Sequence, residues 1–333
     1  MKIARIPLQV GSRFHFGDFR IDTNVGLSST SVIAHSDTLF SALINCAAAF
    51  GDAELLVKSF IDSETNISSL FYYLNRGNTI VYFLPKPISL EIDNKIDGKH
   101  KKRNKIKFVS LGIWKAGFHQ DKWFEEECND YKIIQDEFVL LNEEYVSLIQ
   151  NETQKLKVYE ITQSPKSPIR KIDEESIYYQ TDIVIAGNGN GIETGFYFLY
   201  DLNDNEIELV LKNAVNVLSK SGIGGERNNM GQSMGNPVFS KVSFDEIESE
   251  HLSSISLISP SNLNEYKMIN HYKTILRGGR RLTSGSTYQV VRMMLEGAIC
   301  NNKINGNLIK IGKDDENNIA YRNGKAFLIP VKL

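Results

Sequence analysis

The first third of the chain alternates strand-like and helix-like hydrophobic patterns. Residues 2–10 (KIARIPLQV) alternate apolar and polar side chains, which predicts a strand. Residues 38–50 (TLFSALINCAAAF) form the clearest predicted helix. Ser36 and Asp37 precede it and can accept its first N–H groups, and Gly51 suits its end.

The middle of the chain is less regular. Residues 79–84 (TIVYFL) predict a strand that stops at a Pro-Lys-Pro segment, and residues 105–114 (KIKFVSLGIW) predict a further strand. Residues 115–155 are mixed and acidic, and their pattern assigns no element. Residues 163–168 (QSPKSP) have the composition of a loop or linker.

A second strand-rich half follows. Residues 176–186 (SIYYQTDIVIA) and 195–200 (GFYFLY) predict two strands, and residues 206–220 (EIELVLKNAVNVLSK) show helical spacing. Further strands are expected at 237–244, 255–259, 272–277 and 326–331.

Each half thus runs from a strand through a helix to more strands. This order predicts an α+β fold built from two ferredoxin-like, split βαβ domains. With 333 residues, the chain is long enough for two domains, which we place at 1–165 and 166–333.

Composition indicates a water-soluble globular protein. Hydrophobic residues make up 41% and charged residues 23% of the chain, and no apolar run reaches the length of a membrane span. The N-terminus lacks the layout of a signal peptide, so we expect a cytoplasmic protein with no membrane partner. The three cysteines are far apart, which predicts neither a zinc site nor a disulfide framework.

The charge is segregated along the chain, although the formal net charge is only −2. Residues 99–107 (KHKKRNKIK) and 277–281 (RGGRR) are basic, and a local positive surface is enough to hold phosphates. Because no aromatic residue interrupts 99–107, we favour a solvated, disordered loop there over a phosphate track.

The most informative segment is Gly222–Gly231 (GIGGERNNMG), directly after the predicted helix. Its glycines let the backbone approach a ligand closely, and consecutive N–H groups can cradle phosphate oxygens. Arg227, Asn228 and Asn229 would add side-chain donors. The alternative is a helix end followed by an ordinary turn. Neither a P-loop nor a Rossmann fingerprint fits this order of elements.

The glycine-rich segment resembles the C-terminal loop of the RAMP superfamily, and within it the fourth subunit of type III-A CRISPR (Csm) effectors. Other segments are similar to that family in the same order along the chain. They are His15-Phe16-Gly17, residues 36–43 (SDTLFSAL), 83–88 (FLPKPI), 280–288 with Ser284-Gly285-Ser286-Thr287, and 323–331 (NGKAFLIPV). Glu226 stands where the family has Lys, and Gln232 stands where an aromatic residue or glycine is expected.

The resemblance implies a scaffold subunit that is not an enzyme and needs no cofactor or metal. It implies binding to the 5′ tag of the crRNA, and to target RNA through the complex. It also implies docking to the large polymerase-like subunit and to the first copy of the backbone subunit. The residues expected to contact RNA are His15, Phe16, Gly17, Ser36, Lys86, Gly222, Gly224, Gly225, Arg227, Asn228, Asn229, Gly231, Arg277, Arg280, Arg281, Ser284 and Thr287.

Several roles stay open from the sequence. Phe14, His15 and Phe16 could stack a base or belong to the core, and Asp37 is favoured as a helix cap. A RAMP endoribonuclease that processes precursor crRNA is the alternative function, with His15, Tyr288 or Lys86 as general acid or base. An enzyme that binds a phosphorylated small molecule at the glycine loop ranks last, because only Glu226 and Arg227 titrate there.

Overall fold

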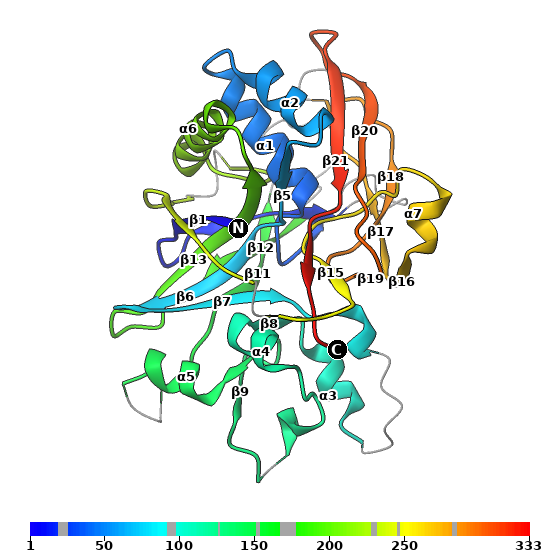
Figure 1. Ribbon diagram of the computed structural model, residues 1–333. Helices are drawn as coiled ribbons and strands as arrows, with labels where there is room; N and C mark the ends of the chain where they lie inside the picture. The colour runs from blue at the N-terminus through cyan, green and yellow to red at the C-terminus, as the bar shows by residue number, and fades with distance from the viewer. Residues whose placement is uncertain are drawn as a thin grey trace.

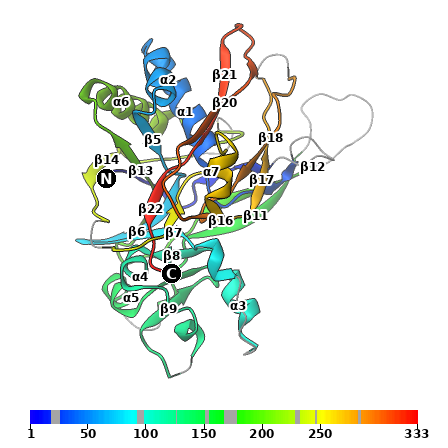
Figure 2. The same ribbon diagram turned by 45° about the vertical axis from the view of Figure 1, so that its right-hand side comes forward.

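A computed structural model describes residues 1–18, 26–91, 98–125, 127–150, 154–166, 178–227, 232–244, 247–281 and 285–333. Its strands form two main sheets, with α1, α2 and α6 above the larger sheet and α4 and α5 below it (Figure 1). Turning the molecule keeps these layers apart and brings the C-terminal strands forward (Figure 2).

The first unit has a ferredoxin-like plan. Its strands lie in the order β14 (Val238–Lys241), β1 (Lys2–Pro7), β13 (Glu193–Leu202) and β6 (Phe71–Arg76), with antiparallel neighbours. Helices α1 (Ser36–Ala48) and α6 (Asn205–Ser221) connect β1 to β6 and β13 to β14. The predicted strand at 2–10 and the helices at 38–50 and 206–220 are therefore confirmed.

A long insertion separates β6 from β13. It extends the sheet through β7 (Thr79–Pro85), β8 (Phe108–Ser110), β10 (Phe138–Leu141) and β9 (Tyr131–Ile134). It also holds η1 (Ile88–Glu91), α3 (His100–Lys105), α4 (Leu111–Ala116), η2 (Lys122–Phe124), α5 (Asn142–Leu148) and the strands β11 (Tyr159–Lys166) and β12 (Tyr178–Ile185). The remaining elements of the first unit are β2 (Arg13–Phe14), β3 (Gly17–Asp18), β4 (Gly26–Thr30), α2 (Ala53–Ile61) and β5 (Thr65–Ile67).

Three predictions for this region were wrong. Residues 111–116 form a helix, because the Ser110 hydroxyl accepts the Ile113 N–H at 3.2 Å and caps it. Residues 163–166 belong to β11, where they pair with β12 and do not form a linker. The basic run 99–107 contains α3, with Arg103 fully buried, and is not a disordered loop.

The second unit repeats the ferredoxin-like order with one replacement. Its sheet runs β16 (Ile269–His271), β19 (Ile299–Cys300), β15 (Leu252–Ser254) and β22 (Leu328–Pro330), again antiparallel throughout. Helix α7 (Leu263–Lys267) connects β15 to β16, and the hairpin β20 (Gly306–Lys313)–β21 (Ile319–Lys325) takes the place of a second helix. Strands β17 (Thr274–Arg277) and β18 (Val291–Met294) form a separate hairpin. The predicted α+β fold with two ferredoxin-like units is confirmed.

The sheet order moves the division between the units. The predicted boundary at 165/166 would separate β13 and α6 from β1, but β13 pairs with both β1 and β6 in the centre of the first sheet. The division therefore falls after β14, and the glycine-rich segment belongs to the first unit.

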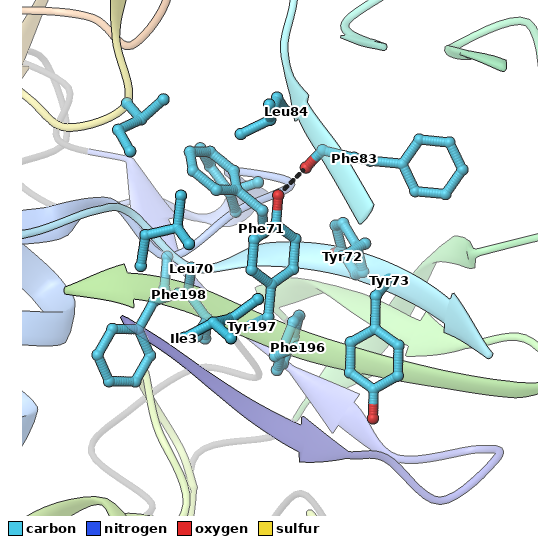
Figure 3. Close-up of a cluster of buried hydrophobic side chains, with 14 of the residues drawn as sticks. Ile3, Leu70, Phe71, Tyr72, Tyr73, Phe83, Leu84, Phe196, Tyr197 and Phe198 are labelled. Atoms are coloured by element: carbon cyan, nitrogen blue, oxygen red, sulfur yellow. Dashed lines mark hydrogen bonds between the residues drawn. The ribbon is translucent and has the colours of Figure 1, made fainter. Parts of the chain in front are cut away.

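Aromatic side chains fill the core of the first unit. Phe71, Tyr72, Phe196 and Phe198 are all fully buried between the sheet and its covering elements (Figure 3). The Tyr197 hydroxyl, equally buried, donates to the Phe83 carbonyl at 2.8 Å, which satisfies the one polar atom of that side chain. This rigid core fixes the ends of β13 and α6, from which the glycine loop leaves.

Candidate functional site

The glycine loop leaves α6 and packs on the segment after β2. Gly222 ends the helix with a φ of 80°, and Gly224 has a φ of 91°, a conformation that favours glycine. The Gly225 N–H donates to the His15 carbonyl at 2.9 Å. A Cβ on Gly224 would lie 2.4 Å from that same carbonyl oxygen, so this contact requires glycine.

Gln232 closes the base of the loop. Its amide oxygen accepts the Ile223 N–H at 2.9 Å, and its amide nitrogen donates to the Ile223 carbonyl at 2.9 Å. The side chain thus bonds to both main-chain groups of Ile223, as a neighbouring strand would, and it holds the two ends of the loop together. These two hydrogen bonds explain why a glutamine can stand at position 232, where the resemblance predicts an aromatic residue or glycine. The sequence did not indicate them.

The tip of the described loop faces solvent. Gly225, Glu226 and Arg227 are exposed, and Glu226 adopts a φ of 53°. Positive φ in a residue with a side chain is uncommon, and successive N–H groups around such a residue can form a concave site for an anion. The predicted contacts Asn228, Asn229 and Gly231 lie outside the described residues.

The aromatic residues beside the loop belong to the core. Phe16 is 4% exposed, and Phe14 packs edge-on against Phe196 with ring centroids 4.9 Å apart. Their rings are therefore not free to stack on a base. Of the two roles that the sequence left open for them, they have the one in the core. Gly17 begins β3. The segment meets the glycine loop through a main-chain bridge between His15 and Gly225.

His15 lies between the loop and β12. Its ring is 2% exposed, and Nδ1 is 2.8 Å from the Thr181 carbonyl oxygen. Nε2 is enclosed and has no hydrogen-bond partner among the described residues. This environment holds the ring in place to support the loop and keeps it away from solvent.

Asp37 and Arg277 form a buried ion pair in place of the predicted helix cap and phosphate contact. Arg277 donates to both carboxylate oxygens of Asp37 at 2.9 Å, and Arg322 donates to Oδ2 at 2.6 Å. Although burial raises the pKa of Asp37, the two guanidinium charges outweigh it and hold this pKa far below its usual range. The pair joins the start of α1 to β17 and β21, that is, one unit to the other.

Ser36 and Lys86 are likewise enclosed. The Ser36 hydroxyl accepts the Leu257 N–H at 3.0 Å and is fully buried. The Lys86 ammonium donates to the Arg103 carbonyl at 2.9 Å, and burial lowers the pKa of Lys86 to about 8. Both side chains therefore support the fold in this structure and do not present charge or donors at the surface.

The remaining predicted residues lie on a hairpin of the second unit. Arg280 and Thr287 are bridge partners and both are exposed. The Arg281 guanidinium lies 5.6 Å from the centre of the Tyr288 ring, which is a cation–π contact. Arg280 and Arg281 can thus form a basic surface, whereas Ser284 lies outside the described residues.

A buried network that the sequence did not indicate also joins the two units. His35 Nδ1 lies 2.9 Å from Glu296 Oε1, and the Ser69 hydroxyl donates to the same oxygen. The side chains of His35 and Glu296 are both less than a tenth exposed. Because the partners are 261 residues apart, no local pattern could have found them.

Two further observations concern ligands and membranes. Within the ranges given above, no three His, Cys, Asp or Glu side chains gather closely enough to hold a metal ion. No helix in the same part of the chain has the length and apolar content needed to cross a membrane.

Comparison with known proteins places this architecture. Residues 248–331 match the CRISPR Csm4 C-terminal domain family. Over its whole length the chain is similar to a chain of the Csm3–Csm4 subcomplex of the type III-A CRISPR-Cas interference complex, at 22% identity, with a TM-score of 0.70 and 100% of each chain covered.

The chain also matches the Csm1–Csm4 cassette in complex with pppApA. The identity is 18% and the TM-score 0.57, covering 100% of this chain and 99% of the other. None of the curated proteins compared matches the sequence. The resemblance predicted from the motifs is therefore confirmed: residues 248–331 match the CRISPR Csm4 C-terminal domain family, and the whole chain has the fold of chains in solved Csm3–Csm4 and Csm1–Csm4 structures.

Proposed function

We propose that the chain is a non-catalytic scaffold subunit of a cytoplasmic type III-A Csm complex that binds the 5′-tag end of the crRNA. The observation that carries this proposal is the exposed turn at Gly225–Arg227, held by main-chain contact to His15. Such a turn can present N–H groups and a guanidinium to phosphates, and the exposed Arg280 adds positive charge from the second unit.

The similar structures support a proposal about protein partners. One of them pairs Csm4 with Csm3 and the other pairs Csm4 with Csm1. We therefore propose that this chain docks a backbone subunit similar to Csm3 and a large subunit similar to Csm1. Co-expression with each subunit, followed by size-exclusion chromatography, tests both contacts separately.

RNA binding should depend on the basic hairpin in a salt-dependent way. Arg280→Ala with Arg281→Ala is expected to weaken binding of tag RNA and to lower the slope of log K against log salt by roughly 0.7 per lost contact. Fluorescence anisotropy at several salt concentrations measures both quantities.

The matched control removes two exposed lysines, Lys58 on α2 and Lys267 on α7, by substitution with Ala. It changes the net charge equally and should leave the slope nearly unchanged. Equal slopes for wild type and the double arginine variant would show that these side chains do not face the RNA.

We also expect the purified chain to leave crRNA, target RNA and DNA intact, with or without Mg²⁺. Of the three candidate acid–base residues of the alternative endoribonuclease, His15 is enclosed with its Nδ1 close to the Thr181 carbonyl oxygen, Lys86 is enclosed as well, and Tyr288 is half-buried. A cleavage assay on labelled nucleic acids checks this, with His15→Ala, Asp18→Ala and Asp37→Ala run beside the wild type. Product that disappears in one of these variants, while circular dichroism shows that the variant is folded, would establish catalysis in place of the scaffold role.

A further inference from the structure

The two faces of the first sheet have different surroundings. Because side chains alternate along a strand, the register assigns each residue of β1, β13, β6 and β7 to one face. One face carries Ala4 and Phe198 and packs under α6, where Lys2 and Tyr200 reach Glu208. On the opposite face, Leu111, Val242 and Phe244 cover the half around Ile3 and Leu84.

The other half of that opposite face, around Arg5 and Val238, is only partly covered. Arg5 pairs with Tyr197 on one side and with Val238 on the other, and Tyr73 pairs with Tyr82. These register partners share a face. Val238 is 44% exposed, and Arg5 and Tyr82 are half-buried. We name the side chains Arg5, Tyr73, Asn75, Tyr82 and Val238 the Arg5 face.

A glycine makes room for the Tyr73 ring on this face. A Cβ on Gly195 would lie 2.2 Å from the Tyr73 ring, so this ring occupies the space above the strand. The Tyr73 hydroxyl donates to Glu193 at 2.8 Å, which fixes the ring, and the Tyr82 ring centre lies 6.3 Å from that of Tyr73. The Tyr73 ring is itself 1% exposed, so it is a buried support for the half-buried Tyr82 ring on the neighbouring strand.

Polar groups with unmet hydrogen-bonding capacity lie beside these rings. Arg5 Nε is enclosed without a partner, and the Arg5 side chain forms no hydrogen bond or ion pair with any residue that the structure describes. Asn75 Oδ1 is also enclosed without a partner in that part of the chain. Burial raises the pKa of Tyr82 and the charge of Arg5 opposes this rise, which places the guanidinium beside the phenol. Such groups are costly to leave unsatisfied.

We propose that the Arg5 face binds a splayed base of single-stranded RNA. Arg5 stacks on the base or donates to its edge, Asn75 pairs with the base edge after a small rotation, and Tyr82 supplies the aromatic wall. RRM domains, which share the ferredoxin-like sheet, bind bases on this same helix-free surface. The inference rests on the RNA binding proposed above and adds a second contact surface on the first unit.

The chemistry favours RNA over a protein partner. Protein interfaces are centred on an apolar core, whereas Val238 is the one large hydrophobic side chain of the Arg5 face that is exposed. An unpaired guanidinium beside two phenols matches base stacking and base-edge recognition instead.

The test uses the full chain and a fluorescein-labelled, unstructured RNA octamer at fixed salt. Arg5→Ala should raise Kd by about tenfold, as expected for loss of one stacked or bidentate base contact. Arg5→Lys should recover only part of this affinity, because it keeps the charge but not the planar fork. Tyr82→Ala should also weaken binding, because it removes the aromatic wall, and ultraviolet crosslinking of the wild type should label the peptide that contains Tyr82.

Thermal unfolding of each variant separates lost contacts from lost folding. If Arg5→Ala is folded and neither its affinity nor the crosslink changes, the proposal is overturned. It is also overturned if Arg5→Ala keeps RNA affinity but loses a Csm subunit in co-purification, since the face is then a protein interface. The loss of affinity in the Arg280→Ala/Arg281→Ala variant, with the Tyr82 crosslink retained, would support two separate contact surfaces. If the wild type does not bind the octamer at all, the proposed function itself fails.

Discussion

Asp37→Asn is expected to lower the free energy of unfolding by about 3 to 5 kcal/mol, the cost of removing one partner from a buried ion pair. Asp37 is 3% exposed, and Arg277 and Arg322, which both donate to it, are 6% and 8% exposed. The carboxamide cannot neutralise two enclosed guanidinium groups. Urea denaturation followed by circular dichroism measures the change.

The same ion pair predicts how stability depends on pH. The folded-state pKa of Asp37 is held far below the value near 3.9 expected in the unfolded chain. The stabilisation is therefore complete above about pH 4 and is lost as the pH falls from there toward the folded pKa. Asp37→Asn should abolish this part of the acid dependence, so that the two proteins converge in stability at low pH.

Glu54→Gln is the matched control, because Glu54 lies in the first turn of α2 and is exposed. Its loss should cost less than about 0.5 kcal/mol. A similar small cost for Asp37→Asn would mean that water reaches the carboxylate and that the two units are not joined through it.

Local patterns predicted the strands β1, β7, β13 and β14 of the first sheet and the helices α1 and α6, but not the strand β6. The apolar spacing of 206–220 and the Asp204 side chain, which accepts the Glu206 N–H at 2.7 Å, are both local features, and α6 follows them. Residues 111–116 were assigned wrongly because their apolar run suits a strand as well as a buried helix, and only the Ser110 cap separates the two.

The candidate site divides in the same way. Clustered glycines mark a loop locally, so the segment after α6 could be predicted, and its contact with His15 could not. Arg277 and Arg280 are equivalent in the sequence, but one is buried on Asp37 across 240 residues and the other is exposed. Which arginine is available to a ligand depends on tertiary contacts that composition does not contain.

The order of the two units shows a further limit of reading along the chain. A division at 165/166 follows the loop-like composition of 163–168, but strand order decides which segments share a sheet. Because β13 inserts between β1 and β6, a segment far along the chain completes the first unit. Ferredoxin-like sheets make this possible, since their central strands are not consecutive in sequence.

Gly224→Ala is expected to reduce affinity for tag RNA by at least about tenfold while leaving a folded protein. The added Cβ would lie 2.4 Å from the His15 carbonyl oxygen, and alanine is strained at a φ of 91°. The loop must therefore move away from His15, which displaces the exposed turn at Gly225–Arg227. Gly225→Ala should have a smaller effect, because its Cβ would meet His15 Cδ2 at 3.2 Å.

Gly191→Ala controls for strain alone, since Gly191 has a φ of 74° but nothing lies within 4 Å of a Cβ there. It should cost about 1 kcal/mol of stability, the usual penalty for alanine in this conformation, and leave RNA affinity unchanged. Anisotropy with tag RNA, below the unfolding temperature of every variant, compares the three. If Gly224→Ala binds as tightly as Gly191→Ala, the loop does not approach the RNA, and contacts such as Arg280 and Arg281 must carry the binding by themselves.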